Sequence, residues 1–128
     1  MNFNNSVIDW KQVDNVISSS NRILLTTHEN PDGDGLGSEV AMYHHLCDEK
    51  KDVKIINCSI TPLMFDYINE GGCIETYNES YHLEWLKKCE LVIVFDVGDF
   101  NRTRSVKEAV ERFNIPVMNI DHHPHPDK

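Results

Sequence analysis

Five short strand-like runs, separated by helical patterns or turn residues, constrain the fold of this chain most strongly. They lie at residues 22–27, 53–57, 73–77, 91–95 and 117–120. The run from Leu91 to Phe95 is apolar at every position, as expected of a strand that is buried on both faces of a sheet. Strands that alternate with helices form parallel sheets through right-handed crossovers. The sequence therefore predicts an α/β fold: a doubly wound, mainly parallel sheet with helices on both faces.

Helical patterns fill most of the spaces between these runs. Val7, Trp10, Val13 and Ile17 form an apolar stripe, with Ser6 as the expected N-cap. Further helices are expected near residues 36–47, 62–70, 81–88 and 103–113. The chain has no internal repeat and no long linker, so its 128 residues suit one domain.

Charge and cysteine content narrow the classes of function. The formal net charge of -9 argues against nucleic-acid binding through a broad basic surface. It is compatible with a small phosphorylated substrate, because bound cations reverse the local potential of an acidic site. Cys47, Cys58, Cys73 and Cys89 form no C-x-x-C pair and are interpreted as buried, reduced thiols. No apolar run approaches the ~20 residues of a membrane span, and the first residues do not resemble a signal peptide. We therefore expect a cytoplasmic protein without membrane contact.

Acidic and histidine side chains follow three of the expected strands. In chain order they are His28, Asp32 and Asp34, then Asp96, then Asp121, His122 and His123. Ligands of doubly wound sheets gather at the carboxyl ends of the strands. Imidazole and carboxylate groups suit manganese, magnesium or iron better than a thiolate-loving metal. Two metals that share a carboxylate fit this number of groups, and such a pair activates water and clamps a phosphoryl group.

Each of these residues also has a purely structural interpretation. An aspartate after a strand can make a turn or cap a helix, which fits Asp99 as well as a functional role does. Asp96 taken alone is consistent with either a turn residue or a ligand. His44 and His45 are expected on a helix, one facing solvent and one at the rim of the core, and His82 on a helix surface. The coincidence of three clusters at the ends of parallel strands favours a site.

These clusters resemble the motif series of the DHH phosphoesterase family. His28-x-x-x-Asp32-x-Asp34, within His-Glu-Asn-Pro-Asp-Gly-Asp-Gly-Leu-Gly-Ser, is similar to its first motif. Asp96, within Val-Phe-Asp-Val-Gly-Asp, is similar to its second, and Asp121-His122-His123 is the element that names the family. Order and spacing agree from residue 22 to residue 124, and the family fold is the doubly wound sheet expected above.

The resemblance implies a set of metal ligands. His28 and Asp32 would hold one Mn²⁺ ion, Asp34 and His122 would hold a second, and Asp96 would bridge the two. Mg²⁺ or another divalent ion is an alternative.

The resemblance also implies roles toward the substrate. His123 would contact the phosphate and stabilise developing charge, which makes His123 and Asp96 the expected catalytic residues. Asp121 would orient its loop. Arg102 lies where the family often has an arginine able to meet phosphate; the alternative is a surface pair with Asp99.

The motif style is most similar to the branch that degrades very short RNAs or dephosphorylates adenosine bisphosphate, whose members are often called exopolyphosphatase-related. The resemblance implies a manganese-dependent phosphoesterase that acts on small phosphorylated substrates or short single-stranded oligonucleotides, and it is compatible with a homodimer. Polyphosphatases and pyrophosphatases share the same first-domain chemistry. The alternative from another class is a non-catalytic module that binds metal or nucleotide.

Members of the family carry a later aspartate and a second, substrate-holding domain. We therefore expect residues 1–128 to be a truncated N-terminal DHH domain with little or no activity alone. A dinucleotide-binding oxidoreductase is set aside, because no G-x-G-x-x-G follows the first strand.

Overall fold

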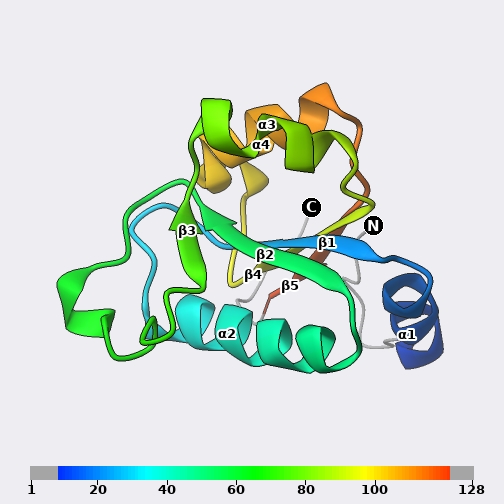
Figure 1. Ribbon diagram of the computed structural model, residues 1–128, viewed down its shortest axis with the longest axis horizontal. Coiled ribbons are helices and arrows are strands. Elements are labelled where there is room, and N and C mark those ends of the chain that lie inside the picture. The colour runs from blue at the N-terminus through cyan, green and yellow to red at the C-terminus, as the bar shows by residue number, and fades with distance from the viewer. Residues whose placement is uncertain (1–8, 122–128) are drawn as a thin grey trace.

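The computed structural model describes residues 9–121 and contains one five-stranded sheet (Figure 1). Its strands are β1 (Arg22–Thr26), β2 (Asp52–Asn57), β3 (Ile74–Thr76), β4 (Leu91–Phe95) and β5 (Val117–Ile120). Their order across the sheet is β3-β2-β1-β4-β5, and every neighbouring pair is parallel. The predicted doubly wound α/β fold is confirmed. All carboxyl ends meet at one edge, with β1 at the centre of the sheet.

Helices cover both faces of the sheet. The long helix α2 (Gly33–Asp48) lies on one face, and α3 (Glu79–Lys87) and α4 (Ser105–Arg112) lie on the other (Figure 1). The short helix α1 (Trp10–Ser18) packs its apolar side against the core on the α2 side. None of the helices in the described part of the chain has the length and apolar character needed to cross a membrane.

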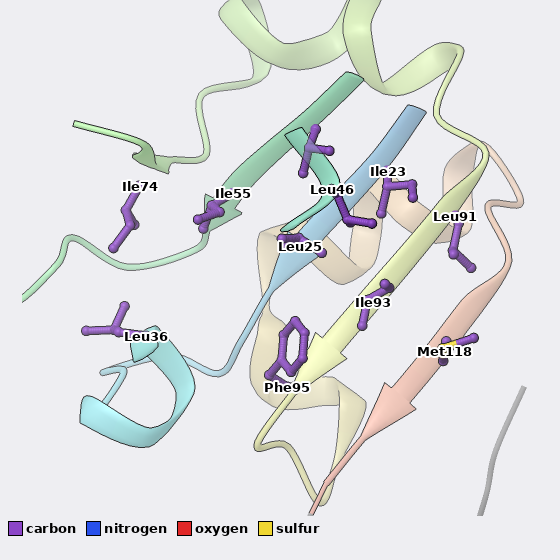
Figure 2. Close-up of a cluster of buried hydrophobic side chains, with 11 residues drawn as sticks. Ile23, Leu25, Leu36, Leu46, Ile55, Ile74, Leu91, Ile93, Phe95 and Met118 are labelled. Atoms are coloured by element: carbon purple, nitrogen blue, oxygen red, sulfur yellow. The ribbon is translucent and has the colours of Figure 1, made fainter. Parts of the chain in front are cut away.

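Two apolar cores hold these layers together, because alternate residues of each strand point to opposite faces. Ile23, Leu25 and Ile93 join the core beneath α2, which Figure 2 shows. Leu24 and Val92 join the core beneath α3 and α4. Every residue of β4 is buried, which explains its uninterrupted apolar sequence. Burying each such side chain contributes about 1.5–3 kcal/mol to folding.

Several boundaries differ from the sequence prediction. Asp9, not Ser6, caps α1: its side chain accepts a hydrogen bond from the Gln12 amide, and the helix begins at Trp10. Residues 62–70 form only the 3-10 turn η1 (Leu63–Phe65) and further turns, because Leu63 has no core to face and is 85% exposed. The helix expected at 103–113 is divided into η2 (Phe100–Thr103) and α4, since Arg104 adopts a positive φ of 51°.

Two predictions about burial are wrong. Cys47 is exposed, and the other three cysteines are only partly buried, because they lie in loops or at element ends; all four are free thiols. His82, expected on a helix surface, is 2% exposed, because it lies on the side of α3 that faces the sheet. Its Nδ1 accepts a hydrogen bond from the Asn78 amide, and its Nε2 lies 2.8 Å from Oε1 of Glu75.

Candidate metal centre

The neighbouring ends of β1 and β4 bring three of the expected ligands together. His28 and Asp32 come from the segment after β1, and Asp96 directly follows β4. Nε2 of His28 lies 3.5 Å from Oδ2 of Asp96 and 3.8 Å from Oδ2 of Asp32. One potential ligand atom from each residue lies within 4.8 Å of the others. Residues far apart in the chain thus form one compact nitrogen-and-oxygen donor set.

The hydrogen bonding of His28 directs one ring nitrogen at this cluster. Its Nδ1 lies 2.6 Å from the carbonyl oxygen of Glu29, which can only accept a hydrogen bond. When the ring is neutral, Nδ1 therefore carries the proton, so Nε2, which lies beside the two carboxylates, is available to coordinate a cation. Metal-binding histidines generally have this arrangement, in which the distal ring N–H donates to a carbonyl or carboxylate.

The two carboxylate oxygens of Asp32 have different surroundings. Its Oδ1 accepts a hydrogen bond from the Gly35 amide and caps α2, which is why this helix begins at Gly33 rather than near Leu36. Desolvation raises the pKa of Asp32, but the Gly35 amide, a hydrogen bond with Asp96 and the charge of His28 outweigh it and lower the pKa. The carboxylate is therefore ionised at neutral pH, and its other oxygen lies toward the cluster.

Asp96 is held in an unusual backbone conformation. It has a φ of 61°, in the left-handed region that aspartate tolerates better than most residues. Its amide donates to the carbonyl oxygen of Ile120, which ties it to the end of β5. The residue is 5% exposed. A buried carboxylate with a fixed backbone beside an imidazole is suited to binding a cation.

Thr27 connects the strand ends that carry these ligands. Its hydroxyl donates a 2.7 Å hydrogen bond to the carbonyl of Phe95, immediately before Asp96. A Cβ at Gly35 would approach the same Thr27 hydroxyl oxygen to 2.6 Å, so only glycine lets α2 start this close to β1. The glycine in the sequence motif is thus explained by packing beside the ligands.

The other predicted residues occupy varied places. Asp34 is exposed in the first turn of α2 and lies outside the three-residue cluster. Asp121 lies at the end of β5, with one oxygen 4.0 Å from where a Cβ on Gly98 would be. His122 and His123 lie outside the described residues. The roles predicted for these residues therefore remain predictions.

Arg102 is exposed in η2, and within residues 9–121 it makes no ion pair with Asp99. Its carbonyl accepts a hydrogen bond from the Glu29 amide, which places η2 against the His28 loop. Asp99 instead caps η2 through the Asn101 amide. The basic residue that pairs here is Arg104, whose guanidinium contacts Glu29 at 2.7 and 2.8 Å. No local sequence pattern indicates this pair, since 75 residues separate its members.

The donor set fits a hard or borderline divalent ion. One imidazole nitrogen and two carboxylates, with no cysteine among them, suit manganese, magnesium or iron. These three donors would leave coordination positions open, as required of a metal that also binds water or substrate.

Comparison with known proteins supports this interpretation. The family model described as "DHH family, N-terminal domain" matches residues 22–128. The chain belongs to the DHH family. The match includes all three residues of the cluster, and it confirms the family predicted from the motifs.

One relative in sequence and one solved structure are similar to this DHH domain. It is 27% identical over 113 residues to the bifunctional oligoribonuclease and PAP phosphatase NrnA of Mycoplasma genitalium, a match that covers 88% of this chain and 34% of the relative. The crystal structure of an exopolyphosphatase-related protein from Bacteroides fragilis superimposes with a TM-score of 0.82 at 22% identity, over 96% of this chain and 38% of that one. At this level of sequence identity, the structural similarity to the Bacteroides fragilis protein shows the fold alone. The DHH domain thus spans about a third of the length of each relative.

Proposed function

We propose that this DHH domain is the metal-binding part of a phosphoesterase that hydrolyses phosphate esters of short oligonucleotides or nucleotide phosphates with Mn²⁺. The observation that carries the proposal is the convergence of His28, Asp32 and Asp96 at the junction of β1 and β4. This junction is at the carboxyl edge of the sheet, where doubly wound folds bind their ligands.

In this proposal, His28 and Asp32 would hold one ion, and Asp96 would be shared with a second. Asp34 and His122 are the further ligands that the family motif supplies. When bound, two divalent ions lower the pKa of water and neutralise charge on a phosphoryl group. The chain's own contribution is geometric: the Nδ1–H bond to Glu29 fixes the imidazole, and Thr27 fixes the distance between the two strand ends.

Substrate contacts are assigned to His123 and Arg102. The exposed side chain of Arg102 is within the segment that packs on the His28 loop, through the hydrogen bond from the Glu29 amide to the Arg102 carbonyl. A guanidinium there would pair with phosphate in two-point geometry. The substrate class rests on the similarity to NrnA, whose name gives both an oligoribonuclease and a PAP phosphatase activity.

The proposal is tested by calorimetric titration of Mn²⁺ into the wild type, Asp96→Asn and Asp66→Asn. Asp66 is an exposed carboxylate outside the cluster, so it controls for the loss of one charge. We expect Asp96→Asn to lose at least about 100-fold in affinity, more than is typical for residues that only support a ligand, while Asp66→Asn binds normally. Equal binding by the wild type and Asp96→Asn would contradict the site assignment.

Hydrolysis is measured on the same three proteins with a ribonucleotide dimer and adenosine bisphosphate. Turnover that depends on Mn²⁺ and on Asp96 supports the phosphoesterase. Specific Mn²⁺ binding without turnover of either substrate would show that residues 1–128 alone bind metal without catalysis, as expected of a domain that spans about a third of its relatives' length. Circular dichroism checks that Asp96→Asn keeps its fold.

A further inference from the structure

A buried carboxyl group lies outside the metal-binding cluster and has no role in the proposed chemistry. Glu39, in the second turn of α2, is 0% exposed. Its Oε1 accepts a 3.0 Å hydrogen bond from Nδ2 of Asn57, the last residue of β2, which is also fully buried. Burial of a carboxyl group costs free energy even when it is hydrogen-bonded. The buried side of α2, where an apolar residue would be expected, thus carries a carboxyl group that faces the side-chain amide of Asn57.

The Asn57 side chain can adopt only one orientation here. The backbone N–H of Thr27 can only donate, so the Asn57 atom 3.1 Å from it is the oxygen. The hydroxyl of Thr26 reaches the same oxygen at 3.4 Å. The Asn57 nitrogen then faces Glu39, where it requires an acceptor. An apolar side chain at position 39 would leave this buried nitrogen unsatisfied.

This chain of hydrogen bonds ends at Thr27, which lies next to the candidate metal centre. Thr27 directly precedes His28, and its hydroxyl holds the Phe95 carbonyl directly before Asp96. The Thr27 amide donates to Asn57, and the Thr27 hydroxyl donates to β4. Both the backbone and the side chain of Thr27 are thus fixed by hydrogen bonds in the protein interior. A rotation of the Asn57 amide would release the Thr27 amide and change where the chain leaves β1.

We propose that Glu39 and Asn57 are positioning residues of the metal centre. Together they fix the end of β1, so that Nε2 of His28 faces Asp96. The inference rests on the proposed function of that cluster as a metal centre, and it adds two residues that touch neither metal nor substrate.

The test compares Glu39→Gln, Glu39→Met and Val110→Ala at pH 7. Glutamine keeps an oxygen that accepts from Asn57, whereas methionine has a similar length and no comparable acceptor. Val110, in the core beneath α4, is a control for a loss of stability on the other face of the sheet. Three quantities are measured: hydrogen exchange of the Thr27 amide, the imidazole resonances of His28 without metal, and the affinity for Mn²⁺.

In Glu39→Met, we expect the His28 resonances to move, the Thr27 amide to exchange at least about 10-fold faster than in Val110→Ala, and Mn²⁺ affinity to fall by about 10- to 100-fold, the range for residues that orient metal ligands. Glu39→Gln should remain within about 3-fold of the wild type in affinity, because it keeps the acceptor. A folded Glu39→Met protein with unchanged Thr27 exchange and His28 resonances would overturn the proposal. So would a Glu39→Gln protein that loses as much as Glu39→Met.

The metal-free measurements separate this proposal from the proposed function. If neither the wild type nor any variant binds Mn²⁺, the metal assignment is refuted. If Thr27 exchange and the His28 resonances nevertheless change in Glu39→Met and in no other variant, the positioning of His28 is supported. If Mn²⁺ binds with wild-type affinity to Glu39→Met, the metal assignment is supported and the positioning role is refuted.

Discussion

Replacement of Glu39 by glutamine should change how the stability of the protein depends on pH. Burial raises the pKa of Glu39 from 4.5 to about 8, although the hydrogen bond from Asn57 opposes this rise. The folded state therefore binds a proton that the unfolded state releases between these values. The contribution of Glu39 to stability is greatest below pH 4.5 and is lost as the pH rises, until Glu39 ionises in the folded protein near pH 8. Glu39→Gln cannot ionise and lacks this loss.

The magnitude follows from the same two values. At about 1.36 kcal/mol per pH unit, the wild type should lose on the order of 4 kcal/mol relative to Glu39→Gln between pH 5 and pH 8.5. The amide of the introduced glutamine places a donor at a buried position, with a cost of about 1–3 kcal/mol that does not vary with pH. The pH dependence of the difference is thus the quantity to compare. Cys73, the titratable neighbour, has a raised pKa from burial and stays neutral through most of this range.

Urea unfolding followed by circular dichroism at pH 5, 6, 7 and 8.5 measures this difference. Glu70→Gln, which removes an exposed carboxylate from the loop before β3, serves as the matched control and should give a nearly constant difference from the wild type. If the difference between the wild type and Glu39→Gln changes by less than about 1 kcal/mol over the range, Glu39 ionises normally in the folded state. The reasoning from its burial would then be wrong.

Three further predictions concern contacts around the site. Gly35→Ala should destabilise the protein by about 1–3 kcal/mol, because its Cβ would meet the Thr27 hydroxyl at 2.6 Å; Gly37→Ala, with nothing within 4 Å, should be neutral or stabilising in thermal unfolding. Thr27→Val keeps the shape but loses the donor to β4, so chemical unfolding should show a loss of about 1–3 kcal/mol, and an unchanged midpoint would contradict the role given to this hydroxyl. Arg104→Gln removes an exposed ion pair with Glu29 and should change stability by less than about 1 kcal/mol, while calorimetry should show nearly unchanged Mn²⁺ affinity; a loss of binding would assign this pair to the site itself.

The sheet was predictable because its signals are local. The strands other than β3 are short, largely apolar runs, and β4 is buried on both faces at every residue, so the sequence itself carries the evidence. The segment at 62–70 has a similar apolar content, but Leu63 and Met64 have no surface to pack against and remain exposed. Whether an apolar segment becomes a helix depends on its packing partners, which a local pattern does not contain.

In the candidate site, too, some residues could be predicted from the sequence and others could not. His28, Asp32 and Asp96 were identified because their residue types and positions after strands carry the chemistry, and the structure brings them together. Glu39 and Asn57 were missed. A glutamate within a helix pattern is expected at the surface, and only the packing of α2 on β2 shows that it is buried against an amide.

The hydrogen bond from Thr27 to Phe95 spans 68 residues of sequence, and this has a consequence for the order of folding. β1 lies between β2 and β4, so an early β1–β2 pair can form from a short stretch of chain, but it contributes His28 and Asp32 to the cluster without Asp96. The entropy of closing the longer loop must be overcome before Asp96 meets His28. During synthesis, His28, Asp32 and Asp96 cannot come together until β4 has emerged and paired. If the proposed metal centre is correct, ions that bind only the assembled cluster would stabilise the completed sheet over any shorter intermediate.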